Sequence, residues 1–271
     1  MNTRHEKSTF ICKCMVSASV APDTFCMEFS WPGPAPRGGQ FFLIKPRRTG
    51  VFLARPISVA FWKQGALGFI VVVRGQGSRD LVDLKPGEEA ELIGPLGNSW
   101  AGASGVFSRA AEKPLGLVAG GVGIAPLLAF IQELEEGPRS NVLRNQVPPN
   151  SVAFDLYAGF RSGSFGLENI KPGSLVVATE DGSQGVKGRI PDFFKPDKYR
   201  VVFACGPEPM LKAVSAKCAA AGVPCFVSME KHMACGVGAC LGCRVKTKGG
   251  NRSCCTDGPI FNAGEILFND R

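Results

Sequence analysis

The sequence lacks the segments by which a chain is secreted or inserted into a membrane. Its first residues, Met1–Ser8, contain no apolar region of about 7–15 residues followed by a small-residue cleavage site. No stretch reaches the roughly 18 consecutive apolar residues of a membrane-spanning helix. We therefore expect a cytoplasmic protein without a membrane span.

The sequence also lacks a basic stripe, internal repeats and low-complexity segments. Its net charge is +8, but the lysines and arginines are scattered along the chain and are not interleaved with aromatic residues. This pattern argues against nucleic-acid binding. A mild basic excess suits anionic cofactors such as dinucleotides, or an acidic protein partner.

What is present is an ordinary globular composition, with 45% hydrophobic and 20% charged residues. The 271 residues suffice for two medium domains, or for two and a small third one. Eleven cysteines in a reducing cytoplasm indicate metal ligands or free thiols. Five of them lie in apolar or alternating segments and are predicted to be buried small side chains, namely Cys12, Cys14, Cys26, Cys218 and Cys225.

The most informative stretch is Cys235-Gly-Val-Gly-Ala-Cys240-Leu-Gly-Cys243, which is followed by Cys254 and Cys255. The spacing C-x4-C-x2-C with a distant cysteine is typical of plant-type [2Fe-2S] sites, which need four thiolates. Three glycines stand between the ligands, where they allow backbone N–H groups to approach the sulfurs. The alternatives are a zinc knuckle and a set of buried structural thiols, but zinc usually takes two C-x2-C-type pairs or cysteine with histidine. Here there is one such pair, and His232 lies outside the loop.

The first hundred residues predict an all-β domain with one helix over 78–84, for which Ser78 is the expected N-cap. Proline and glycine clusters separate short apolar runs, and about six strands at this spacing suggest a small barrel or sandwich. Strands are expected at 10–17, 24–29, 40–45, 57–62, 67–74 and 90–94.

Two segments of this β domain could carry chemistry. In Arg55-Pro56-Ile57-Ser58 the guanidinium could clamp a phosphate, and the hydroxyl could donate to a flavin ring. Arg74-Gly75-Gln76-Gly77-Ser78 is a glycine turn leading into a helix, which suits a pyrophosphate. An exposed arginine at a strand end, and a glycine turn with an ordinary cap, remain the alternatives for these segments.

Residues beyond 113 show an α/β pattern that predicts a doubly wound parallel sheet of about five strands. Segments 101–113 and 137–150 are expected to be surface loops. The strands are expected at 115–119, 152–159, 174–179, 199–204 and 224–228, with helices at 127–135 and 210–221.

Three segments follow strands of this sheet, at the edge where open α/β sheets bind ligands. Gly120-Gly-Val-Gly-Ile-Ala-Pro126 could hold a dinucleotide phosphate on the helix that it begins, although it is not the strict G-x-G-x-x-G pattern and could serve packing alone. The other two are Glu180-Asp-Gly-Ser183 and Cys205-Gly-Pro-Glu-Pro-Met210.

The order of these motifs resembles the ferredoxin–NADP reductase superfamily over nearly the whole chain. Met233–Val245 and Cys255–Phe261 resemble more specifically the electron-transfer subunits of two-subunit (type B) dihydroorotate dehydrogenases. The resemblance implies an FAD-binding β-barrel over 1–108, a Rossmann-like NAD-binding α/β domain over 109–228 and a small [2Fe-2S] domain over 229–271.

The resemblance also implies roles for individual residues. FAD is expected on Arg55, Pro56, Ile57, Ser58, Val72, Val73 and Arg74, with Gly77 and Ser78 at its phosphates. NAD is expected on Gly120, Gly121, Gly123, Cys205, Gly206 and Pro207. The cluster is expected on Cys235, Cys240, Cys243 and Cys255. Catalytic roles are implied for Ser58 and Cys205.

Spacing alone leaves the fourth ligand open between Cys254 and Cys255. The resemblance favours Cys255, because the family ligand precedes x-Asp-Gly-Pro-x-Phe, and Thr256–Phe261 fits that pattern. If the segment is extended, the two thiols point to opposite faces, and Cys254 is expected to face away from the cluster.

The resemblance implies electron flow in pyrimidine biosynthesis, from dihydroorotate through FMN on a separate catalytic subunit to the cluster, FAD and NAD+. NAD takes a hydride and the cluster one electron, so the flavin must lie between them. A heterotetramer with two copies of each subunit is expected. Two other functions stay open: the small subunit of another NAD(P)H-linked ferredoxin-type reductase, of the transhydrogenase or sulfide dehydrogenase type, and a non-enzymatic cluster-binding module.

Overall fold

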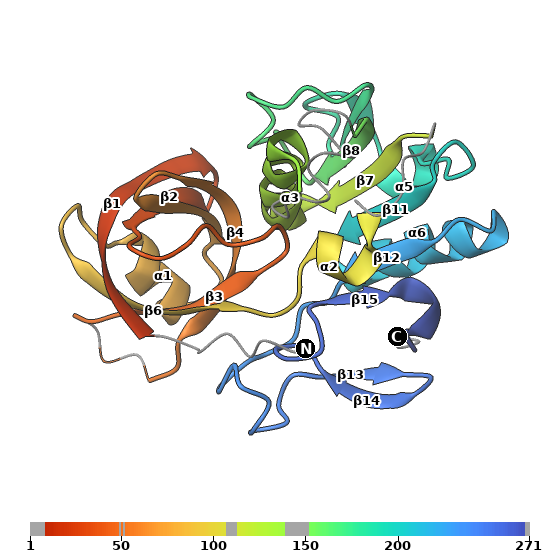
Figure 1. Ribbon diagram of the computed structural model, residues 1–271. Helices are drawn as coiled ribbons and strands as arrows, with labels where there is room; N and C mark the ends of the chain where they lie inside the picture. The colour runs from red at the N-terminus through yellow and green to blue at the C-terminus, as the bar shows by residue number, and fades with distance from the viewer. Residues whose placement is uncertain (1–8, 49, 51, 107–112, 139–151, 269–271) are drawn as a thin grey trace.

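The computed structural model describes residues 9–48, 50, 52–106, 113–138 and 152–268. Along the chain a β-barrel is followed by a sheet flanked by helices and then by a smaller C-terminal segment (Figure 1). The barrel and the sheet stand side by side, and the C-terminal segment lies along the lower side of both (Figure 1). Within the described ranges no helix has the length and apolar character needed to cross a membrane.

The barrel is closed and antiparallel, and among the described residues its strands follow the order β1-β2-β5-β4-β3-β6. All six predicted strands are present, because alternate residues in each can be buried inside the barrel. In β6 every second residue is buried along the whole strand. The strands are β1 (Thr9–Ala21), β2 (Thr24–Ser30), β3 (Phe41–Pro46), β4 (Arg55–Lys63), β5 (Ala66–Val72) and β6 (Glu89–Leu96).

The predicted barrel helix is α1 (Gln76–Val82), which begins two residues before the expected start. Gly75, in extended conformation, precedes the helix, so the expected N-cap role of Ser78 was wrong. Ser78 instead stands in the first turn, and its Oγ accepts the backbone N–H groups of Arg74 and Gly75 at 2.8 and 3.1 Å. The side chain therefore closes the turn from inside the helix.

The sheet of the described residues has seven strands in the order β10-β9-β8-β7-β11-β12-β15. The five predicted strands are all present and parallel. The two additional ones are the short β10 and the antiparallel edge strand β15. The strands are β7 (Leu115–Gly120), β8 (Phe154–Phe160), β9 (Leu175–Thr179), β10 (Val186–Lys187), β11 (Val201–Cys205), β12 (Cys225–Ser228) and β15 (Ile260–Asn262).

Helices cover both faces of the sheet, as predicted for a doubly wound fold. The short 3-10 turn η2 (Gly121–Gly123) leads into α3 (Ile124–Glu136), which lies between the sheet and the barrel (Figure 1). On the far face lie α5 (Ile190–Phe193) and α6 (Glu208–Ala220) (Figure 1). The linker helix α2 (Trp100–Ser104) buries its tryptophan, whose ring N–H donates to the carbonyl of Pro126 at 3.1 Å.

Helix α3 fastens the barrel to the sheet. Its Glu133 carboxylate is 1% exposed and accepts the N–H of Gly38 at 2.9 Å and the Nε–H of Arg37 at 3.1 Å. The preceding residue is Gln132, whose side chain bonds the backbone N–H and carbonyl of Trp62 in β4. Because these partners come from two barrel segments, two neighbouring side chains of α3 hold the helix to the barrel on two sides.

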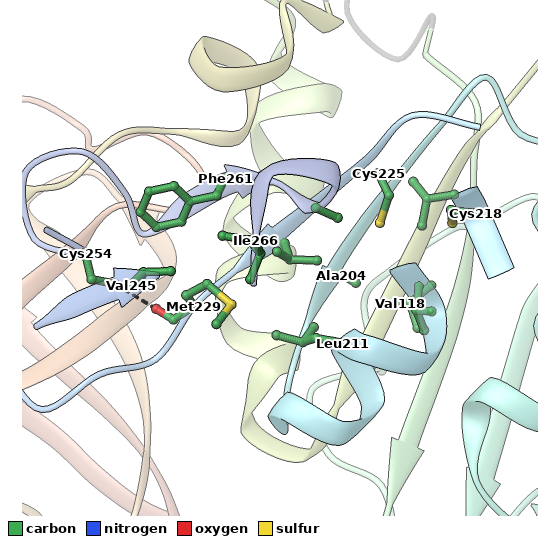
Figure 2. Packing of buried hydrophobic residues seen from close by; sticks show 14 of the residues in the cluster. Val118, Ala204, Leu211, Cys218, Cys225, Met229, Val245, Cys254, Phe261 and Ile266 are labelled. Atoms are coloured by element: carbon green, nitrogen blue, oxygen red, sulfur yellow. Dashed lines mark hydrogen bonds between the residues drawn. The ribbon is translucent and has the colours of Figure 1, made fainter. Parts of the chain in front are cut away.

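The C-terminal segment is continuous with the core of the sheet. After β12 the chain forms the cysteine loop, then a hairpin of β13 (Arg244–Thr247) and β14 (Gly250–Ser253), and returns as β15 to pair with β12. Asn98 fixes this return, since its side-chain amide donates to the carbonyl of Ile260 at 2.8 Å and accepts the N–H of the same residue at 3.0 Å. The 3-10 turn η3 (Ala263–Glu265) follows. Buried side chains of the segment and of α6 form one cluster (Figure 2).

Candidate functional site

The start of β4 and the turn before α1 meet on the outside of the barrel. Gly77 lies directly under the guanidinium of Arg55, and a Cβ atom at this position would overlap it. Only glycine therefore leaves the guanidinium in this place without a shift. Arg55 also donates to the carbonyl of Leu53 at 2.6 Å, which holds the side chain along the strand end. The fold thus brings together the two segments that the sequence assigned to a pyrophosphate.

The hydroxyl of Ser78 is engaged within this turn. Besides accepting two backbone N–H groups, it donates to the carbonyl of Gly75 at 2.9 Å. Its contribution is therefore to the shape of the turn, while Arg55 supplies the positive charge. This donor set fits a pyrophosphate, which needs a cation and an approachable backbone.

Neighbouring barrel residues form a half-buried wall beside this turn. Pro56, Ile57 and Ser58 on β4, and Val72 and Val73 at the end of β5, are all of intermediate exposure. The 3-10 turn η2 contacts β5, so the wall lies next to Gly121–Gly123, which are among the residues expected to bind NAD. A mainly apolar wall of this kind suits a flat aromatic ring such as a flavin.

The two glycine-containing turns of the sheet pack against each other at the carboxyl ends of β7 and β11. A Cβ atom on Gly123 would overlap the carbonyl of Cys205, and one on Gly206 would lie 2.9 Å from the Cα of Gly120. Gly121 differs, because open space surrounds it and its φ of +54° favours glycine. The fold therefore gathers all of the residues expected to bind NAD, and it leaves free room only over Gly121.

Cys205 is buried beneath these turns, with 2% of its surface exposed. Burial raises the pKa of its thiol, the charge of Glu230 raises it further, and a hydrogen bond with Ser228 opposes both effects. The surroundings of Cys205 therefore favour the neutral thiol over the thiolate.

Glu230 is a candidate site residue that the sequence analysis missed. Its side chain reaches solvent, but protein surrounds the carboxylate closely enough for desolvation to raise its pKa, against the charge of Arg74, which lowers it. Electrostatically it is coupled to Arg74 in the expected flavin turn and to Cys205 in the expected NAD turn. The available signal was its place just after β12, at the same sheet edge as the other turns.

The loop of the first three cysteines turns its backbone N–H groups toward sulfur. The N–H groups of Val237 and Cys240 each lie 3.4 Å from Cys235 Sγ. These hydrogen bonds lower the pKa of Cys235 to about 6, with that from Val237 the largest cause. The loop achieves this shape with positive φ angles at Gly236 and Gly238, of +64° and +82°. Thiolate stabilised by N–H groups is what an iron–sulfur cluster requires of its ligands.

Cys255 faces this loop and Cys254 does not. Burial raises the pKa of Cys255 to about 11, a hydrogen bond with Cys243 raises it too, and the N–H of Gly238 lowers it. Cys254 is fully buried and donates to the carbonyl of Met229 at 2.9 Å (Figure 2). Burial raises the pKa of Cys254 to about 12, so it remains a thiol in the core.

In the described residues no three histidine, cysteine or acidic side chains converge on a point where one metal ion would bind. A [2Fe-2S] cluster has no such requirement, because each of its irons takes two protein thiolates. The loop also packs on the barrel, where a Cβ atom on Gly236 would lie 2.7 Å from Leu43 Cδ1. Leu43 pairs with Pro56 of β4, so the cysteine loop and the flavin-type wall share neighbouring strands.

The remaining polar cluster lies at the end of β9. Asp181 accepts the N–H and the hydroxyl of Ser183, and these two bonds lower the pKa of its carboxyl. Ser183 in turn accepts the N–H of Gly163, which follows β8. The exposed carboxylate of Asp181 thus stays charged beside the NAD-type edge of the sheet.

Comparisons with known proteins agree with this geometry. The family model described as "Iron-sulfur cluster binding domain of dihydroorotate dehydrogenase B" matches residues 230–267. The electron transfer subunit of dihydroorotate dehydrogenase B (NAD(+)) from Clostridium acetobutylicum is 39% identical over 236 residues, which cover 86% of this chain and 87% of that one. A solved NADH-dependent reduced ferredoxin–NADP oxidoreductase, studied for flavin-based electron bifurcation, shares 26% identity at a TM-score of 0.75 and covers 99% of this chain and 92% of its own.

A flavohemoglobin from Malassezia yamatoensis with bound FAD and heme is 18% identical, with a TM-score of 0.62 over 79% of this chain and 57% of its own, which shows a likeness of fold. The solved structures therefore place the barrel and the sheet in the ferredoxin reductase-like fold. The relative from Clostridium acetobutylicum points to one family within this fold, because its sequence identity to this chain extends over most of both chains. The chain belongs to the family of electron transfer subunits of dihydroorotate dehydrogenase B (NAD(+)).

Proposed function

We propose that this chain passes electrons from a separate catalytic subunit, through a [2Fe-2S] cluster and FAD, to NAD. The observation that carries the proposal is that the three cofactor-type segments meet around strands β3, β4 and β5. The cysteine loop packs on Leu43 of β3, Arg55–Ser58 lies on β4, and η2 contacts β5. Such proximity is what sequential electron transfer requires.

FAD would be held by Arg55, by the turn at Gly77 and Ser78, and by the wall that includes Val72. Arg55 supplies a bidentate cation for the pyrophosphate, and Gly77 keeps that guanidinium in place. Ser58, at the middle of the wall, would donate its hydroxyl to the ring. When bound, the flavin exchanges hydride with a nicotinamide and single electrons with an iron–sulfur cluster, which no side chain does.

NAD would reach the chain as a substrate and bind across Gly120–Gly123 and Cys205–Pro207. The positive dipole end of α3, which begins at Ile124, suits its pyrophosphate. The open space at Gly121 gives the dinucleotide room. Glu230 would stand where the flavin and the nicotinamide meet, as a carboxyl whose charge is disfavoured by its surroundings.

The cluster would be ligated by Cys235, Cys240, Cys243 and Cys255. The N–H groups directed at Cys235 stabilise its thiolate, and the contact between Cys243 and Cys255 brings the fourth thiol to the loop. We assign residues 229–271 to cluster binding, 1–108 to FAD and 109–228 to NAD. Strand β15 of segment 229–271 belongs to the sheet of segment 109–228, because it pairs with β12.

The partner would be an FMN-containing catalytic subunit that docks over the cysteine loop, in an assembly with two copies of each chain. Cys240 is exposed, and the loop presents the apolar side chains of Val237 and Leu241, which are 47% and 54% exposed. Apolar side chains around an accessible cluster ligand suit a protein interface better than contact with water.

The test is reconstitution. The isolated chain, loaded with FAD and cluster, should reduce an artificial acceptor such as ferricyanide with NADH and should not oxidise dihydroorotate. With the co-expressed catalytic subunit, NAD+ should be reduced by dihydroorotate, and gel filtration should show both chains together. Dihydroorotate turnover by the pure single chain, or no electron transfer to NAD+ from the pair, would overturn the proposal.

A second candidate function is a subunit of another NAD(P)H-linked ferredoxin-type reductase. It is favoured by the NADH-dependent reduced ferredoxin–NADP oxidoreductase, whose fold covers 99% of this chain. The two functions differ in the protein that delivers electrons to the cluster. Affinity purification from the native source, with the partner identified by mass spectrometry, separates them.

A further inference from the structure

The hairpin beside the cysteine loop carries an unusual concentration of positive charge. Between residues 231 and 256 the sequence holds five lysines and arginines and no aspartate or glutamate. The lysines and arginines of the whole chain are scattered, but these five fall within one short segment, and four of them lie on the hairpin. The five are Lys231, Arg244, Lys246, Lys248 and Arg252.

Three of these cations project from one face of the hairpin. Arg244 and Lys246 on β13, and Lys248 just beyond it, alternate with the buried residues Val245 and Thr247. Successive side chains of a strand point to opposite faces, so the three cations are neighbours about 7 Å apart. All three are exposed to solvent.

Almost none of this charge is compensated within the chain. Among the described residues, only Lys231 of the five has a carboxylate within salt-bridge distance, that of Glu208 at 3.3 Å. Arg244 donates instead to the neutral backbone carbonyl of Asn251 at 2.7 Å. Neighbouring like charges repel, and the fold itself gains nothing from them.

Protection of a free sheet edge explains these cations only in part. Lysine and arginine on an exposed edge strand discourage pairing with other chains, and Arg252 on the edge strand β14 fits that role. The outer edge of β13, however, is already covered, because the N–H of Leu267 donates to the carbonyl of Lys246 at 3.0 Å and Thr247 bridges to Ile266. The cations of β13 therefore have no edge to protect.

We infer that the hairpin face of Arg244, Lys246 and Lys248 is an electrostatic docking surface for a carboxylate-rich face on the catalytic subunit. The inference rests on the proposed function. β13 starts directly after Cys243 and β14 ends just before Cys254 and Cys255, so a partner bound to this face is held beside the cluster. Figure 1 shows the hairpin and the cysteine loop on the same lower side of the molecule. Exposed charges of this kind act mainly on the rate of association.

The test uses the complete FAD- and cluster-loaded chain and the recombinant catalytic subunit. Lys246→Glu/Lys248→Glu should lower the association rate constant at low ionic strength by tenfold or more. The difference should vanish at about 1 M salt, where the Debye length falls to about 3 Å. The matched control is Lys171→Glu/Lys195→Glu, which makes the same change in net charge at exposed loop positions away from the hairpin and should retain the wild-type rate within about twofold.

Reduction of the bound flavin by NADH, which needs neither the partner nor a charged acceptor, should remain at the wild-type rate in both variants and so reports an intact fold. A neutral pair, Lys246→Gln/Lys248→Gln, should show a smaller reduction of the same sign. An unchanged association rate in the glutamate variant, or an equal loss in the control pair, would overturn the docking surface. Failure of the wild-type chain to associate with the catalytic subunit would overturn the proposed function instead.

Discussion

Cys254 and Cys255 are neighbours in the chain but have opposite surroundings. Cys255 approaches Cys243 and the N–H of Gly238, whereas Cys254 is buried against the carbonyl of Met229. Cys255→Ser should therefore abolish or strongly alter the EPR and visible spectra of the [2Fe-2S] cluster, because one iron loses a thiolate. Cys254→Ser should keep both spectra and cost on the order of 1 kcal/mol of stability, since the serine hydroxyl can still donate to Met229. The reverse pattern would move the ligand to Cys254.

Glu230 gives the molecule a pH dependence whose sign is fixed by its surroundings. Its folded-state pKa is raised by desolvation from the surrounding protein, so the folded chain binds a proton more tightly than the unfolded chain does. Stability should therefore fall as pH rises from the ordinary glutamate pKa of about 4.3 through the raised value. Glu230→Gln should lack this fall and be the more stable protein at neutral pH, with no advantage at about pH 4. Denaturation midpoints across this pH range measure the difference, and a constant difference at every pH would contradict the assignment.

At the scale of single residues, the sequence identified the functional residues that form a motif of characteristic spacing. The cysteine pattern is explicit because three thiolates must come from one short loop. Glu230 carries no such pattern, and only the fold relates it to Arg74 and Cys205. The environments of Cys254 and Cys255 likewise depend on the carbonyl of Met229, which is distant in sequence.

At the scale of elements, η2 offers a controlled test of NAD binding. Gly121 has a φ of +54° and open space around it, so a side chain there would enter the room expected for the dinucleotide. Gly222, after α6, has a φ of +65° and equally open surroundings, but it lies away from the turn. Gly121→Val and Gly222→Val should therefore lose similar stability, on the order of 1–2 kcal/mol. Only Gly121→Val should slow flavin reduction by NADH, by tenfold or more, in stopped-flow absorbance. Equal rates in the two variants would place NAD elsewhere.

Prediction of the elements succeeded where burial is periodic. The six barrel strands and five parallel strands were found because their alternating or continuous apolar residues reflect burial on one face or on both. The start of α1 was misplaced, since Ser78 acts from within the first turn. Strand β15 was not predicted, because three residues are too few to show an alternation of apolar and polar side chains. The strand is formed by its pairing with β12.

At the scale of the whole molecule, the order of motifs predicted the architecture well, because each of the three segments carries its own signature. The contacts between the barrel, the sheet and the C-terminal segment could not be predicted from the sequence. The bonds of Glu133 to Gly38 and of Asn98 to Ile260 join positions far apart in sequence. The covering of the outer edge of β13 by Ile266 and Leu267 is of the same kind, because it appears only in the fold.

The return of the chain as β15 shows that the cysteine-containing C-terminal segment is not an independent structural domain. A detachable ferredoxin-like unit would have its own core and a single linker. Here the segment leaves the sheet after β12 and comes back to pair with that same strand, and its buried side chains share a cluster with α6. The segment is therefore joined at both ends to the seven-stranded sheet. Exchanging the segment as a unit would therefore remove an edge strand from that sheet.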